Sequence, residues 1–115
     1  MIKIKLHLVL TSLILVFAGC GINSVTKAQL EAVKPADILV YRYQKDGKSW
    51  FYADKITRIE GDKVYYNPSI QEGTAGNDER IYGFNTTREL SISKAELLSY
   101  ATEQGDDKKV IIWIK

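Results

Sequence analysis

The residues with the clearest chemical potential are aromatic side chains gathered in the first strands expected from this sequence. Their rings offer large apolar faces, and tyrosine and tryptophan add a polar atom that prefers a hydrogen bond. Such residues either pack the core of a small β domain or line a groove for a peptide, a glycan or a small ligand. The groove candidates are Tyr43, Trp50 and Tyr52, within the set Tyr41, Tyr43, Trp50, Phe51, Tyr52, Tyr65, Tyr66 and Tyr82.

Acidic side chains are the second group of candidates. Asp78 and Glu79, and Asp106 and Asp107, sit in turn-like segments, but neither pair has the ligand spacing of a known calcium loop. We therefore expect no metal site. Asp54 follows the aromatic residues closely and is the carboxylate that we consider for a small-ligand site or a weak hydrolase.

The N-terminal segment has the order of a secretory signal peptide. Lys3 and Lys5 precede an apolar run over 6–18, which small residues close. The run is about a dozen residues long, whereas a helix needs roughly 20 to cross the hydrocarbon core of a bilayer. We expect residues 1–19 to be cleaved from the chain.

The residues Ala18-Gly19-Cys20 resemble the lipobox of bacterial lipoproteins, although Phe17 stands where that family mostly has leucine. The resemblance implies that Cys20 is acylated, and two or more acyl chains give stable membrane anchoring. An ordinary secretory signal with a nearby cysteine is the alternative. Gly21 replaces the aspartate that usually retains lipoproteins in the inner membrane. The resemblance thus implies the bacterial cell envelope, at the periplasmic face of an outer membrane where one exists.

Cleavage changes both the charge and the chemistry of the chain. Loss of Lys3 and Lys5 leaves fourteen basic and fourteen acidic residues, so the mature chain is formally neutral and gives no argument for nucleic acid. The only histidine, His7, also leaves, and the only cysteine is Cys20. Without an imidazole or a free thiol, we expect no enzyme, no catalytic residues and no cofactor.

Residues 20–36 are expected to form a lipidated cysteine and tether. Thr26 and Gln29 have the spacing of a capping box for a short helix from Lys27 to Val33, which Pro35 would end. A helix this short is unstable without packing, so a flexible leash is the alternative.

The segment from Asp37 shows the period-two alternation of antiparallel strands, with Leu39, Tyr41 and Tyr43 on one face of the first. Turns at Asp46-Gly47 and 61–62 predict a meander of three strands, over 37–43, 50–59 and 64–66. Two further short strands are expected at 79–84 and 89–92.

The C-terminal part predicts a helix and a final strand. Ser93 and Glu96 form a capping box for a helix that starts at Lys94 and that Gly105 would end. The run 110–114 is apolar and rich in β-branched residues, which is typical of a strand buried on both faces. We expect this last strand to be central to the core.

The element order predicts a mainly β domain over residues 37–115, as a small antiparallel SH3-like barrel or meander with one short helix before the last strand. An open sheet with that helix across one face is the alternative. Residues 35–66 resemble Tudor-type SH3-like domains, which cage a methylated cation between aromatic rings. The matching runs are Pro35-Ala36-Asp37-Ile38-Leu39-Val40, Trp50-Phe51-Tyr52-Ala53-Asp54-Lys55-Ile56 and Gly61-Asp62-Lys63-Val64-Tyr65.

Two classes of function remain open. In the first, the β domain is a binding or accessory module, held at the membrane to dock a protein or peptidoglycan partner. In the second, it is a small-ligand binder or weak hydrolase that uses the aromatic mouth and Asp54. An enclosed pocket would favour the second class, and a flat surface with an exposed apolar patch would favour the first.

Overall fold

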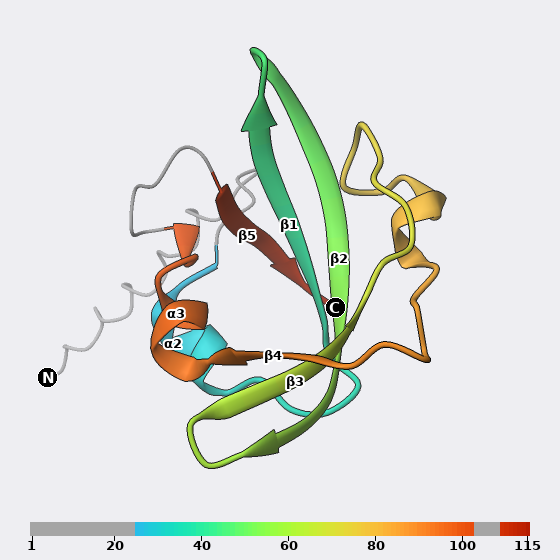
Figure 1. Ribbon diagram of the computed structural model, residues 1–115. Helices are drawn as coiled ribbons and strands as arrows, with labels where there is room; N and C mark the ends of the chain where they lie inside the picture. The colour runs from blue at the N-terminus through green and yellow to red at the C-terminus, as the bar shows by residue number, and fades with distance from the viewer. Residues whose placement is uncertain (1–24, 103–108) are drawn as a thin grey trace, which may run out of the picture.

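The computed structural model describes residues 25–102 and 109–115, and Figure 1 shows a twisted antiparallel sheet with short helices packed beside it. The predicted signal peptide, Cys20 and Gly105 lie outside the described residues. Within those residues, no helix is long and apolar enough to cross a membrane.

The strands are β1 (Ile38–Lys45), β2 (Lys48–Glu60), β3 (Lys63–Pro68), β4 (Leu90–Ser93) and β5 (Lys109–Ile114). They pair in the order β4-β3-β2-β1-β5, each antiparallel to its neighbours. Asp46 and Gly47 join the first two strands with φ angles of 54° and 75°, as a two-residue hairpin turn requires. The predicted meander of the first three strands is confirmed.

The sheet is open, so the predicted barrel is wrong and the open-sheet alternative is confirmed. A barrel would need β4 to pair with β5, but these are the two outer strands of the described sheet. The outer edge of β5 is occupied by the chain that follows the C-terminal helix: the Ile111 amide donates to the Tyr100 carbonyl at 2.8 Å, and Ala101 bridges Ile111. The segment after α3 therefore occupies this edge at Ile111, where a closing strand would pair.

Both faces of the sheet are covered. The face that we call the helix face carries Leu39, Tyr41, Ile56 and Ile111 and packs against α2 (Lys27–Glu31) and α3 (Lys94–Leu98). The opposite face, the loop face, packs Val40, Ala53, Val110 and Ile112 around Ile81 of a 3₁₀ turn. Figure 1 shows α2 and α3 side by side, with the 3₁₀ turn beyond β2.

Helix α2 confirms the predicted capping box and excludes a leash over its length. The Thr26 hydroxyl accepts from the Gln29 amide at 3.2 Å, and the Gln29 side chain accepts from the Thr26 amide at 2.9 Å. Leu30 is fully buried with Leu97 in the core of the helix face. The packed structure therefore includes Val25 and Val33, before the predicted domain start at Asp37.

The predicted strand at 79–84 is wrong. Residues Glu79–Tyr82 form the 3₁₀ helix η2, and the amide of its second residue, Arg80, donates to the capping side chain of Asp78. A short apolar run has no reliable period, and here the capping carboxylate together with the burial of Ile81 favours a tight turn.

The C-terminal elements match their predicted types but not their extents. Ser93 caps α3 as predicted, through the Glu96 amide at 3.0 Å, yet the helix ends at Leu98. Strand β5 is buried on both faces as predicted, because Val110, Ile111 and Ile112 are all buried. It is therefore central to the core as predicted, with residues in the cores of both faces, although by hydrogen bonding it is an outer strand of the described sheet.

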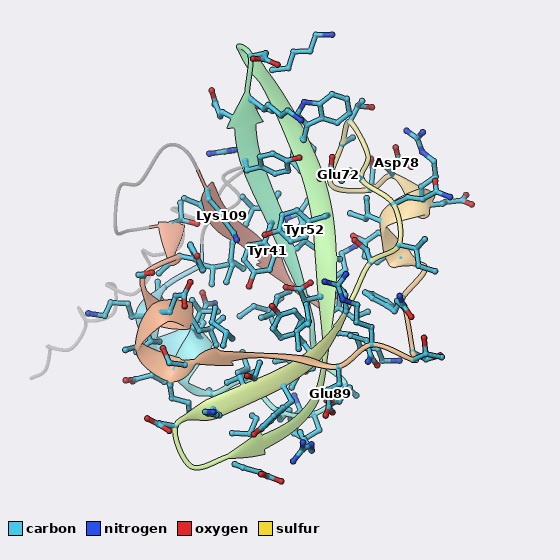
Figure 2. All side chains as sticks on the ribbon, in the orientation of Figure 1. Tyr41, Tyr52, Glu72, Asp78, Glu89 and Lys109 are labelled. Carbon is cyan, nitrogen blue, oxygen red and sulfur yellow. The ribbon has the colours of Figure 1, made fainter. Side chains whose placement is uncertain are left out.

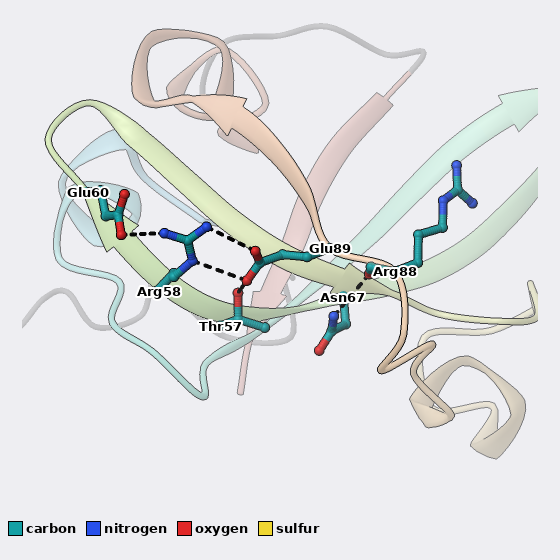
Figure 3. Close-up of polar contacts among 6 residues, drawn as sticks. All are labelled: Thr57, Arg58, Glu60, Asn67, Arg88 and Glu89. Carbon is teal, nitrogen blue, oxygen red and sulfur yellow. Dashed lines mark hydrogen bonds and ion pairs between the residues drawn. The ribbon is translucent and has the colours of Figure 1, made fainter.

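A polar cluster on the surface ties β2 to the segment before β4 (Figure 3). The Arg58 guanidinium donates to both oxygens of Glu89, at 3.3 and 3.1 Å, and also pairs with Glu60. The Thr57 hydroxyl donates to Glu89 at 2.6 Å. These hydrogen bonds lower the pKa of Glu89, with Arg58 as the main cause. Arg58, Glu60 and Glu89 each have a partner within the cluster, which links these two segments.

Candidate functional site

The pairing of β1 with β2 brings the aromatic residues together on the helix face. Tyr41 lies opposite Tyr52, and Leu39 lies opposite Asp54. The rings of Tyr41 and Tyr52 stack with centroids 4.7 Å apart and planes 4° from parallel. Because side chains alternate along a strand, Tyr52 and Asp54 point to the same side as Tyr41.

A cavity of about 250 Å³ lies beside this stack, under α3. We call it the tyrosine pocket. Its aromatic wall comes from three strand residues and from Tyr100, whose ring meets Tyr41 edge-on at 5.8 Å. The cavity is lined by Tyr41, Tyr52, Asp54, Tyr66, Pro68, Leu90, Ser91, Ile92, Glu96, Tyr100 and Lys109.

Asp54 is the unusual group in the tyrosine pocket. It is only 5% exposed, and it is the only buried charged or polar residue among those described. No hydrogen bond or ion pair reaches its carboxylate from the residues that the structure describes. Burial raises its pKa to about 7, and the nearby Lys109 ammonium opposes that rise. An unpartnered buried carboxylate costs stability, so its presence needs an explanation.

Lys109 lies over the tyrosine rings, and Figure 2 shows it directed from β5 toward Tyr41 and Tyr52. Its Nζ atom is 5.2 Å from the Tyr41 ring centroid, 5.5 Å from that of Tyr52 and 4.5 Å from that of Tyr100. These distances are within the range of cation–π attraction. The ammonium is thus held by aromatic faces, and no ion pair joins it to Asp54 in the described part of the chain.

The tyrosine hydroxyls of the pocket are hydrogen-bond donors at physiological pH. Burial raises the pKa of Tyr41, Tyr52 and Tyr66, and the charge of Asp54 raises each of them further. These phenols therefore stay protonated. The cavity combines protonated hydroxyls, aromatic faces and one buried carboxylate, which suits it to hold a polar or charged group.

A second, more open hollow of about 420 Å³ is also lined by Tyr52 and Lys109, the two residues that it shares with the tyrosine pocket. Its other lining residues are Tyr43, Gln44 and Glu72. The Tyr43 hydroxyl donates to Glu72 Oε2 at 2.6 Å, and this hydrogen bond is the main reason that the pKa of Tyr43 rises to about 12. We call the two hollows together the tyrosine groove. Figure 2 shows Glu72 on the loop beside β2.

Two of the three groove candidates predicted from the sequence line the tyrosine groove, and the third does not. Tyr43 and Tyr52 line the tyrosine groove, whereas Trp50, opposite Tyr43 in the hairpin, is half-buried and lines neither hollow. Phe51 and Tyr82 pack against the core of the loop face, and Tyr65 lies under the Arg58 guanidinium at 3.8 Å. The aromatic cluster therefore serves partly as core and partly as lining.

Sequence reasoning missed Tyr100, Lys109, Glu72 and Glu96 as lining residues. Tyr100 follows α3 and Lys109 precedes the apolar run of β5, so each is far along the chain from Tyr41 and carries no local signal of its contact. The helix register of α3 could have suggested Tyr100, because it lies four residues after Glu96, whose carboxylate accepts from its hydroxyl at 3.0 Å.

The carboxylates considered for calcium are engaged elsewhere or lie outside the described residues. Asp78 caps η2 and pairs with Arg80 at 2.7 Å, which lowers its pKa. Asp106 and Asp107 are not described. In the part of the chain that is described, no three His, Cys, Asp or Glu residues gather in a way that could hold a metal ion.

Comparison with protein-family models, with curated proteins and with solved structures finds no match for this chain.

Proposed function

We propose that this protein is a membrane-anchored lipoprotein of the bacterial cell envelope, whose β domain binds a small ligand in the tyrosine pocket. The observation that carries the proposal is Asp54: a carboxylate only 5% exposed, lining a cavity and without a hydrogen bond in the described part of the chain. Buried titratable groups with perturbed pKa values cluster at functional sites, and a ligand donor would satisfy this carboxylate.

The surface supports a ligand pocket better than a flat docking site. Among the described residues, Ile70 is the only large hydrophobic side chain that is exposed, at 68%. A single exposed residue does not make an apolar patch. A protein or peptidoglycan partner remains compatible with this proposal if it inserts one protruding group into the tyrosine pocket.

A weak hydrolase is the second candidate, because Glu96 lines the same cavity as Asp54. With a pKa of about 7, Asp54 has the proton affinity of a general acid. The binding proposal is preferred for two reasons. The Glu96 carboxylate already accepts a hydrogen bond from the Tyr100 hydroxyl. The Lys109 ammonium lies over the Tyr100 ring, within the same cavity. The resemblance of residues 35–66 to Tudor-type domains concerns the β1–β3 meander and stays a prediction.

The ligand site is tested by thermal stability of the purified full chain against a panel of simple sugars, amino acids and amines. We expect one chemical class to raise the melting temperature of the wild type, as ligand linkage requires. The same compounds should have little effect on Asp54→Asn and full effect on Glu89→Gln, the surface control. Equal responses of the wild type and Asp54→Asn would contradict a ligand site at this pocket.

The anchor is tested separately. Replacing the predicted acylation site, Cys20→Ala, should abolish incorporation of a labelled fatty acid, because the thiol is the acceptor. Fractionation should then show the chain uncleaved at the membrane, or released if another peptidase cuts it. Normal fatty-acid labelling of the mutant would end the lipoprotein proposal.

A further inference from the structure

We infer that the ligand of the tyrosine groove is a linear diamine or longer oligoamine, with one primary ammonium at Asp54 and the next beside Glu72. This inference rests on the proposed function, because it names the ligand class of the same pocket. It follows from the hydrogen bonding of Asp54, the balance of charge along the groove, the position of Lys109 and the shape of the two hollows.

The first step concerns the hydrogen bond that Asp54 lacks. An ionised carboxylate is only an acceptor, with room for several donors, and here none of the described residues supplies one. The ligand must therefore bring N–H or O–H groups. A primary ammonium brings three donors and the opposite charge, which makes the strongest type of hydrogen bond to a carboxylate. A quaternary ammonium has no N–H and would leave Asp54 unsatisfied.

The second step concerns charge. Three carboxylates line the tyrosine groove: Asp54 and Glu96 in the tyrosine pocket, and Glu72 in the second hollow. The only ammonium group among the described residues of either lining is that of Lys109. Cations are therefore favoured over anions, and an excess of negative charge remains after one cation has bound. Glu72 accepts one hydrogen bond from Tyr43 and has further acceptor sites for a second ammonium.

The third step is that the protein itself places an alkylammonium against these rings. The Lys109 Nζ lies 4.5 to 5.5 Å from three tyrosine centroids, so the aromatic wall already accepts a primary amine on a flexible carbon chain. Lys109 is long and partly exposed, and it can swing away when a ligand amine enters. It thus acts as an internal competitor for the site.

The last step is shape. Tyr52 lines both hollows, and its ring meets that of Tyr43 at 5.8 Å. Asp54 and Tyr52 are two residues apart on one strand, which corresponds to about 7 Å. A linear carbon chain whose first ammonium lies at Asp54 can run along the Tyr52 ring toward the hollow that Glu72 lines. A bulky or branched cation does not follow this path.

The test is isothermal titration of the full chain in detergent, at pH 8 and low salt, in a buffer without amines. The probes are 1,4-diaminobutane, butylamine, tetramethylammonium, alanine, glucose and tetralysine. We expect 1,4-diaminobutane to bind about 10-fold or more tightly than butylamine, and tetramethylammonium, alanine and glucose not to bind. Tetralysine separates a free amine from lysine side chains of a peptide: binding of tetralysine without binding of the diamine would overturn the inference.

The variants are expected to change the affinity for 1,4-diaminobutane in different directions. Asp54→Asn should weaken 1,4-diaminobutane binding about 10- to 100-fold, the usual range for a charged hydrogen bond, and Glu72→Gln should weaken it less. Lys109→Met should tighten it about 3- to 10-fold, because a competing positive charge is removed. Lys115 is the matched control: its Nζ lies 5.0 Å from the Tyr82 ring and 4.9 Å from that of Trp113, away from the groove. Lys115→Met should leave binding unchanged.

The results that would overturn the diamine inference differ from those that would overturn the ligand pocket itself. If alanine or glucose binds through Asp54 and the diamine does not, the inference is overturned while the ligand pocket stands. If Lys109→Met abolishes binding, Lys109 holds an anionic group of the ligand, and the inference is overturned as well. If diamine binding is the same in Asp54→Asn as in the wild type, the amine lies elsewhere on the surface and both proposals fail for this pocket.

Discussion

A chain truncated before Lys109 is expected not to fold. It loses Val110, Ile111 and Ile112, which are 3%, 0% and 2% exposed. Ile111 belongs to the core of the helix face and the other two to the core of the loop face, so one truncation opens both. At about 1.5 to 3 kcal/mol for each buried side chain, the loss is about 5 to 9 kcal/mol. Domains of this size have about 5 to 15 kcal/mol in total.

The backbone adds to this loss. Ile38 and Lys115 exchange both of their backbone hydrogen bonds, at 2.9 and 2.8 Å, and β1 pairs with β5 from Leu39 to Tyr43. Without β5, this edge of β1 is open to water or to other chains. Circular dichroism during urea unfolding measures the effect. Ile70→Ala, at a side chain 68% exposed, is the control and should change stability by less than about 0.5 kcal/mol. A truncated chain with an unchanged unfolding midpoint would contradict the expectation.

The parts of the fold that the sequence predicted are those fixed by neighbours along the chain. The alternation of Leu39, Tyr41 and Tyr43 and the Asp46-Gly47 turn determine the first hairpin locally, and the structure has it. Ser93 and Thr26 likewise act on amides three residues away. Alternation, turns and caps need no information from the rest of the molecule, so they can be read from one sequence.

The parts that could not be predicted depend on distant contacts. The outer edge of β5 meets the Tyr100 carbonyl, which accepts from Ile111, and this contact joins a residue just after α3 to one in β5. Helix α2 is short, and it is held by Leu30 packing in the same core as Leu97. Both are tertiary effects that override weak local preferences.

The site divides in the same way. Tyr43, Tyr52 and Asp54 were identified because they lie on or near a strand with clear alternation. Trp50 shares that alternation but sits nearer the hairpin turn, outside both hollows. Lys109 enters the site only because β5 pairs with β1, and Glu72 only because its neighbour Gly73 bridges Phe51 at the edge of β2. No spacing of residues in the sequence indicates either pairing.

Asp54→Asn is expected to stabilise the ligand-free domain above pH 7 and to change it little near pH 4. The pKa of Asp54 is raised from 3.8 to about 7 by burial, with Lys109 opposing. Between these two values the folded state holds a proton that the unfolded state releases. The free energy of unfolding therefore falls as the pH rises from about 4 to about 7, and this contribution is then constant. A shift of about 3 pKa units corresponds to about 4 kcal/mol.

The groups that face Asp54 do not reverse this fall in the free energy of unfolding with rising pH. The charge of Lys109 opposes the rise in the pKa of Asp54 without cancelling it. Tyr41, Tyr52 and Tyr66 keep their protons because burial raises each pKa. Asparagine removes the charge but leaves a polar amide in the same cavity, which reduces the gain to about 2 to 4 kcal/mol. Urea unfolding of both proteins at pH 4.5, 6, 7 and 8.5, in buffers without amines, gives the difference at each pH.

Glu89→Gln is the control, because the contribution of Glu89 to stability depends on pH in the opposite direction. The pKa of Glu89 is lowered by its hydrogen bond from Arg58 and by that from Thr57, so its contribution to stability is present at neutral pH and is lost on acidification. The glutamine variant should therefore be less stable than the wild type at pH 7 and should approach it at low pH. For Asp54→Asn the two curves should instead separate as the pH rises, with most of the change between pH 5 and 7. A difference that stays constant across this range would mean that Asp54 is solvated and paired in the folded protein, and the buried carboxylate on which the ligand site depends would be absent.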